Sequence, residues 1–205
     1  MRLLWCAYVF LAMTIGAYAQ GPKEINGATP AQEQLRLIEK AAPADVVKDA
    51  TVYVLGKTGY KKLRQGTNGF SCLVLRERSD TIVPECYDAE GSATLLAADL
   101  YLEQQRAKGR GDEQINAEIE KGFKSGRFKA PRKPGIVYML SPNNRVYDPE
   151  SKKVISFPGH LMFYAPYATA KDVGSGAGAP YLVNPGTAGA LMIVVPAGAP
   201  HPEQH

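Results

Sequence analysis

Residues 66–88 contain two short, mostly apolar runs separated by a charged stretch, and this pattern predicts two short strands joined by a charged turn. When Cys72 is placed opposite Cys86, the strands pair in register and residues 78–80 remain as a three-residue turn, a common hairpin length. Both faces of the hairpin are partly apolar, which favours strands inside a sheet over a free-standing ribbon. One face carries Cys72, Val74, Ile82, Pro84 and Cys86, and the other carries Leu73, Leu75 and Val83.

Two features of this hairpin constrain its surroundings. Pro84 has no N–H to donate to a neighbouring strand, which predicts an edge strand or a bulge at that position. A Cys72–Cys86 disulfide would stabilise the fold by roughly 3 kcal/mol in the chain-entropy description of cross-links. Such a bond persists only in an oxidising compartment. Whether it can form therefore depends on whether the N-terminus carries an export signal.

Residues 1–19 match a secretory signal peptide. Arg2 supplies the positive charge, residues 3–15 form an uncharged apolar run, and residues 17–19 (Ala-Tyr-Ala) match a small-x-small cleavage site. An uncleaved membrane anchor is the alternative, but the apolar run is shorter than the ~20 residues that a spanning helix requires. We therefore expect an exported protein, periplasmic or secreted, with no transmembrane anchor in the mature chain.

The cysteine count agrees with export. The chain has three cysteines, and removal of residues 1–19 would take away Cys6 and leave Cys72 and Cys86 as a pair. An even pair in an exported protein favours a structural disulfide over a reactive thiol. The whole chain carries 24 Lys and Arg against 20 Asp and Glu, a mildly basic balance.

The remaining pattern predicts one α+β domain. A flexible lead and short helix occupy residues 20–43, a single domain spans residues 44–196, and residues 197–205 form a disordered Pro- and Gly-rich tail. Within the domain we expect a largely antiparallel sheet and two amphipathic helices joined by a Gly-Arg-Gly turn, the first over residues 93–108 and the second capped by Asp112 and ending before Gly126. This helical hairpin would pack on one face of the sheet. The expected strands include residues 50–55, 60–64, 135–141, 159–165 and 190–195.

His160 is the first candidate for a binding residue, because the other two histidines lie in the C-terminal tail. Strand alternation places His160 and Tyr164 on one face, where imidazole and hydroxyl could bind a ligand together. We expect the ligand site where this strand meets Tyr164 or Tyr138 and the glycine-rich loop that begins at Gly174. Alternatively, His160 is a general base assisted by Tyr164 and Asp88. The less specific interpretation is a histidine whose ring is satisfied by backbone groups.

Residues 121–133 form a basic segment with two interleaved phenylalanines and no acidic residue. Such a segment can hold anionic lipid or polysaccharide through charge, although a solvated basic loop is the simpler interpretation. Neither a zinc nor a calcium ligand pattern occurs, and we expect no cofactor. The glycine-rich run of residues 174–178 lacks the Gly-Lys-Ser/Thr of a phosphate loop. The six cations of the basic segment are Lys121, Lys124, Arg127, Lys129, Arg132 and Lys133.

Three segments resemble exported bacterial proteins of unknown function: Asn-Gly-Phe-Ser-Cys-Leu-Val at residues 68–74, Gly-Ile-Val-Tyr-Met-Leu-Ser at residues 135–141, and His-Leu-Met-Phe-Tyr-Ala-Pro at residues 160–166. The resemblance implies a bacterial, exported protein and carries no activity, ligand or fold. Our leading hypothesis is a non-catalytic module that binds a small molecule or an envelope partner, and not nucleic acid. The alternatives are a hydrolase that uses His160 as base, and an envelope-surface protein that binds anionic lipid or polysaccharide through the basic segment.

Overall fold

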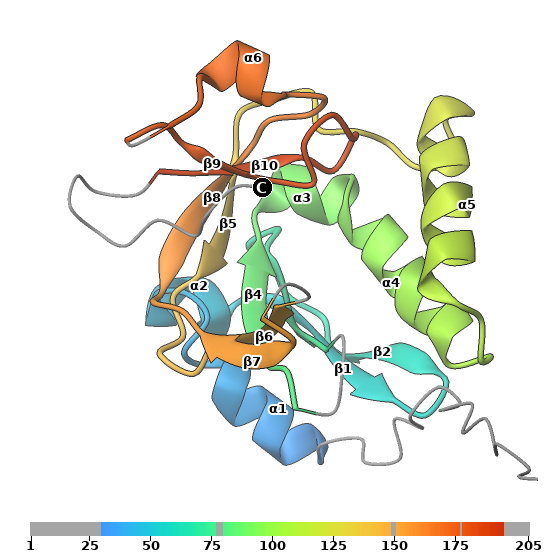
Figure 1. Ribbon diagram of the computed structural model, residues 1–205. Helices are drawn as coiled ribbons and strands as arrows, with labels where there is room; N and C mark the ends of the chain where they lie inside the picture. Colours follow the sequence, from blue (N-terminus) through green and yellow to red (C-terminus); the bar gives the residue numbers. More distant parts are fainter. Residues whose placement is uncertain (1–29, 77–79, 149–150, 177, 195–205) are drawn as a thin grey trace, which may run out of the picture.

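The computed structural model describes residues 30–76, 80–148, 151–176 and 178–194. An eight-stranded sheet in the order β2-β1-β3-β4-β5-β8-β10-β9 forms the centre of the molecule, and β6 and β7 pair separately (Figure 1). All strand pairs are antiparallel except β1 with β3. The strands are β1 (Thr51–Gly56), β2 (Gly59–Arg64), β3 (Ser71–Leu75), β4 (Val83–Tyr87), β5 (Ile136–Met139), β6 (Arg145–Asp148), β7 (Lys153–Ser156), β8 (His160–Tyr164), β9 (Tyr181–Val183) and β10 (Leu191–Ile193).

Helices lie against both faces of the sheet. The described chain begins with α1 and α2, and α3, α4 and α5 follow one another between β4 and β5 (Figure 1). The expectation of a mixed helix and strand protein with a mostly antiparallel sheet is thus confirmed. The helices are α1 (Ala31–Ile38), α2 (Ala44–Lys48), α3 (Ala89–Ala93), α4 (Leu96–Arg106), α5 (Asp112–Lys124) and α6 (Ala170–Val173).

The β3–β4 hairpin has the predicted register. Cys72 lies opposite Cys86, Leu73 opposite Glu85 and Leu75 opposite Val83. A disulfide joins the two cysteines, whose Cα atoms are 4.1 Å apart. This short separation is that of an antiparallel pair that exchanges no backbone hydrogen bonds, in which the side chains approach most closely. The predicted disulfide is confirmed.

The expectation that Pro84 marks an edge strand or a bulge is wrong, because β4 lies between β3 and β5 and the β3–β4 register is unbroken through Pro84. Pro84 faces Val74 two positions from the cysteine pair, so it too is at a non-hydrogen-bonded position with β3. Its nitrogen therefore points to the other side, where β5 pairs only with Cys86 and Tyr87. A central strand can hold this proline because the pairing with β5 has ended before it.

The sheet separates two apolar cores. On the face that carries the disulfide, α1 and α2 pack with Ile38 and Val47 against Val52 and Val74. On the opposite face, Leu95 and Leu96 pack against strand residues that include Leu73, Val83 and Val137. The main contacts of α4 are with β2 and with α5 (Figure 1). The side chain of Gln34 ties α1 to β1, because its amide bonds both backbone groups of Leu55 at 2.8 and 2.9 Å.

Replacing both Cys72 and Cys86 by alanine should lower the free energy of unfolding by about 3 kcal/mol, because the cross-link restricts the unfolded chain. Urea unfolding of the oxidised protein and the double variant measures this difference. The single variant Cys72→Ala is the matched control, since it loses the bond but keeps one thiol. Equal midpoints in all three proteins would show that the disulfide adds no stability.

Candidate functional site

His160 begins β8, and its ring contacts backbone and aromatic groups. Its Nδ1 lies 3.0 Å from the carbonyl oxygen of Pro158, and its ring lies 5.4 Å from that of Phe157. Burial lowers the pKa of the imidazole, and the bond to Pro158 opposes that shift in part. The Nε2 atom is buried and has no hydrogen-bond partner among the described residues. The geometry favours a neutral ring with its proton on Nδ1.

Asp88 and Tyr164 are brought together at the opposite end of β8 from His160. The Tyr164 hydroxyl donates to Oδ1 of Asp88 at 2.8 Å. The same carboxylate accepts backbone N–H bonds from Gly91 at 3.0 Å and Ile136 at 2.9 Å, so it caps α3 and anchors the start of β5. Burial, then the bond to Asp88, raises the pKa of Tyr164. These two side chains hold the fold together at this point.

The structure does not gather the remaining predicted site residues around His160. Tyr164 is four positions beyond His160 along an extended strand, a span of about 13 Å. Tyr138 packs on the other face of the sheet, against the core that contains the disulfide, with its ring 6.2 Å from that of Phe70. Residues 174–178 follow α6, and residue 177 lies outside the described residues.

All six cations of the basic segment are exposed, at the end of α5 and in the loop that leads to β5. None of them forms an ion pair within the described residues. The two interleaved phenylalanines are not available to stack on a ligand at the surface. Phe128 is buried, and Phe123 packs against the apolar core that contains Leu95 and Leu96. A Cβ atom on Gly122 would lie 2.4 Å from the Phe128 ring, so only glycine at that position lets the ring sit on α5.

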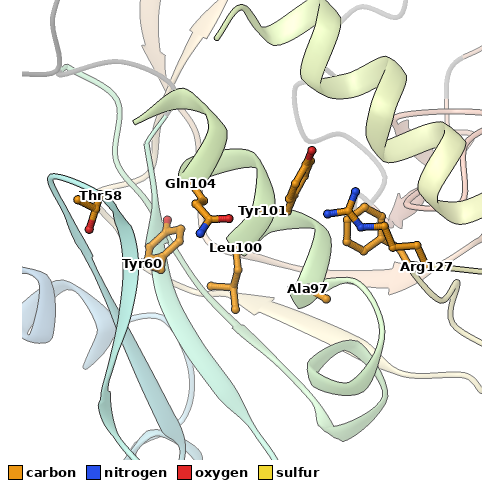
Figure 2. Close-up of a pocket in the computed structure, with 8 residues that line it drawn as sticks. Thr58, Tyr60, Ala97, Leu100, Tyr101, Gln104 and Arg127 are labelled. Carbon is orange, nitrogen blue, oxygen red and sulfur yellow. The ribbon is translucent and has the colours of Figure 1, made fainter. Parts of the chain in front are cut away.

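A pocket of about 340 Å³ lies beside this segment, along the outer face of α4. Figure 2 shows Thr58 and Tyr60 on the β1–β2 hairpin to one side of α4, and Arg127 beside Tyr101 on the other side. Four α4 residues at helical spacing form its floor. The lining residues are Thr58, Tyr60, Ala97, Leu100, Tyr101, Gln104, Arg127 and Phe128.

Close backbone packing creates one wall of this pocket. Gly59 has a φ of +101°, and a Cβ atom built on it would lie 3.0 Å from the Cα of Gln104. The tip of the hairpin therefore rests directly on α4, which places Thr58 and Tyr60 beside the helix. The Tyr60 hydroxyl is held by the backbone oxygen of Val74 at 2.6 Å, so its ring is a fixed surface.

Arg127 forms the opposite wall by stacking on aromatic rings. Its guanidinium lies 4.3 Å from the Tyr101 centroid and 5.0 Å from the Phe128 centroid. The Tyr101 hydroxyl donates to Glu118 at 2.6 Å, and Arg110 pairs with the same carboxylate. These bonds, that to Arg110 first, lower the pKa of Glu118 to about 2. The guanidinium of Arg127 is therefore oriented by the rings, and its N–H groups form no hydrogen bond within the part of the chain that the structure describes.

Sequence reasoning missed this pocket, although one signal was present. Ala97, Leu100, Tyr101 and Gln104 are spaced i, i+3, i+4 and i+7, which marks a second helical face beside the apolar stripe. The approach of Gly59 and Arg127 to that face has no local signature. Arg127 and Phe128 are lining residues that already stand out in the sequence, as members of the basic segment.

No protein-family model, curated protein or solved structure matches this chain. Among the described residues, no group of three or more His, Cys, Asp or Glu side chains could hold a metal ion, and no helix is long and apolar enough to cross a membrane.

Tyr164→Phe should lower the free energy of unfolding by about 1.5–3 kcal/mol, because it removes a hydrogen bond to a carboxylate. Tyr167→Phe is the matched control, since the Tyr167 side chain is 56% exposed and should tolerate the change. Urea unfolding compares the two variants with the unsubstituted protein. Equal stability of the two variants would contradict the structural role of the Asp88–Tyr164 bond.

Proposed function

We propose that this protein is a non-catalytic binding module for a small anionic molecule, and that the pocket on α4 is its site. The observation that carries the proposal is the Arg127 guanidinium, which is stacked on Tyr101 and Phe128 at the rim and makes no ion pair within the described residues. A guanidinium held in this way presents a planar set of donors that matches a carboxylate or phosphate.

The rest of the pocket favours a ligand with an apolar or planar body. Leu100 and the ring of Tyr60 supply apolar surface, while Thr58 and Gln104 supply exposed hydroxyl and carboxamide groups. The lining therefore combines apolar surface with several polar groups that can orient a ligand. The proposal treats α4 and α5 as one hairpin on the sheet, since α4 supplies the floor and α5 supports Phe128.

The surroundings of His160 favour neither the predicted ligand site nor the hydrolase alternative. Among the described residues its polar contact is with a backbone carbonyl, and Asp88 is hydrogen-bonded to Tyr164 at the far end of the strand. The α4 pocket instead contains aromatic, amide and guanidinium groups within one concave surface. We therefore assign binding to the pocket.

Removal of the Arg127 charge should abolish selective anion binding. Carboxylates and their neutral carboxamide analogues form matched probe pairs, and amide chemical shifts of the labelled protein report binding at Tyr60, Leu100 and Gln104. Arg127→Gln should weaken carboxylate binding about 10–100-fold, the equivalent of a lost charge-assisted hydrogen bond.

Lys129→Gln is the matched control, because it removes one charge from the same exposed loop and does not line the pocket. Binding should persist in this variant. Carboxylates that bind unsubstituted protein and Arg127→Gln equally would refute the assignment, as would shifts confined to residues outside the pocket.

A second candidate function is favoured by the six exposed cations of the basic segment, none of which is paired within the described residues. They form a continuous stretch of chain that could hold anionic polysaccharide or lipid headgroups at the cell envelope. This function differs from pocket binding in its salt dependence, since exposed charges are screened. It also predicts similar losses for Arg127→Gln and Lys129→Gln.

Export is part of the proposed function. The disulfide in the β3–β4 hairpin fits an oxidising compartment, and residues 1–19 carry the signal pattern but lie outside the described residues. We expect the protein purified from an exporting bacterial host to lack residues 1–19. Intact mass before and after reduction and thiol alkylation checks this, with two thiols appearing only on reduction. Retention of residues 1–19, or two free thiols without reduction, would contradict export.

A further inference from the structure

The interface between α4 and the sheet contains carboxyl groups at an unusual depth. Glu85, on β4, is 2% exposed, and its Oε1 atom has no hydrogen-bond partner among the described residues. Tyr87, two positions along the same strand, points to the same side of the sheet. Its hydroxyl donates to Oδ2 of Asp99 on α4 at 2.8 Å. Two acids and one hydroxyl therefore meet between strand and helix.

Few positive charges lie close enough to Glu85 and Asp99 to balance their negative charges. Glu103, one helical turn beyond Asp99, is also 2% exposed. Arg106 is the nearest cation, and its guanidinium is bonded to Glu103 at 2.5 Å and to Asp112, at the start of α5, at 2.8 Å. Tyr60 faces the group from β2, and burial first, then the charges of the three carboxyl groups, raise its pKa. Among the described residues, carboxyl groups thus outnumber cations in this cluster.

Burial is the main cause of two raised pKa values. It raises the pKa of Glu85 to about 8, and the nearby charge of Asp99 adds to the shift. It also raises the pKa of Asp99 to about 7, an effect opposed by the Tyr87 bond and reinforced by Glu103. Asp99 is partly exposed to solvent whereas Glu85 is buried. Glu85 therefore keeps its proton to a higher pH than Asp99 does.

We propose that α4 is held on the sheet by a proton-dependent latch, in which Glu85 and Asp99 keep their protons in the folded protein near neutral pH and release them as the helix loosens. A protonated carboxyl group has an O–H that can donate a hydrogen bond to a neighbouring oxygen. When both groups ionise, two like charges remain in a poorly solvated space, which favours separation of α4 from β4. The latch requires no ligand, although the same helix forms the floor of the proposed pocket.

The direction of the pH effect follows from proton counting. Unfolded carboxyl groups ionise near pH 4, whereas the folded pair ionises between pH 7 and 8. Between these limits the folded protein binds more protons than the unfolded chain, so stability falls as the pH rises. The contribution is fully present below about pH 4 and is lost by about pH 8.

Urea unfolding at pH values from 5 to 9 tests the latch on the ligand-free protein. Each retained proton makes the unfolding equilibrium constant rise about tenfold per pH unit between pH 5 and 7. Glu85→Gln fills the same space without ionising. Its unfolding equilibrium constant should therefore rise about tenfold less per pH unit than that of the unsubstituted protein. Asp172→Asn is the control, because Thr169 lowers the pKa of Asp172 and its effect lies at lower pH. An unchanged slope in Glu85→Gln would overturn the proposal.

A measurement on the unsubstituted protein covers the case in which Glu85→Gln fails to fold. Carbon-13 NMR of the side-chain carboxyl groups should show Glu85 and Asp99 titrating near pH 8 and 7, and titration of both below pH 5 would overturn the proposal. Amide hydrogen exchange reports the helix itself. Protection of α4 should fall about tenfold or more between pH 6 and 9 relative to α1. Parallel behaviour of the two helices would overturn the latch.

Discussion

The pairing of β3 with β4 is the constraint on which the rest of the structure depends. A slip of one residue would turn every side chain of one strand to the opposite face. The Cys72–Cys86 bond prevents that slip, because the two sulfur atoms can join only when the residues are directly opposite. The register then assigns Val74 to the core beneath α1, and Leu73 to the core beneath α4.

The same register also places an acid in the second core. Glu85 lies opposite Leu73 and shares its side of the sheet, so the cross-link that orders the hairpin holds a carboxyl group beneath α4. An unpaired carboxylate in such a place is costly, and retention of a proton is the least costly response. The disulfide on one face of the sheet therefore helps to fix the position of the buried Glu85 carboxyl group on the other face.

Helix α4 connects the buried and exposed chemistry of this protein. Asp99 and Glu103 face the interior, while Ala97, Leu100 and Gln104 line a pocket on the outer side. The pocket depends on contacts from elements that are distant in sequence, since the β1–β2 hairpin reaches α4 through Gly59, and Arg127 arrives from the loop after α5. Movement of α4 would alter the buried cluster and the pocket floor together.

Sequence alone determined the hairpin register, the disulfide and the approximate helices and strands, because the alternation of side chains along a strand and the spacing of apolar residues along a helix are local properties of the chain. It could not show that a central strand accommodates Pro84, since this depends on where pairing with β5 ends. Nor could it show that Asp88 binds Tyr164, 76 positions later, rather than serving His160. Tertiary structure decided these contacts because they are made between side chains whose separation depends on the docking of whole strands and helices.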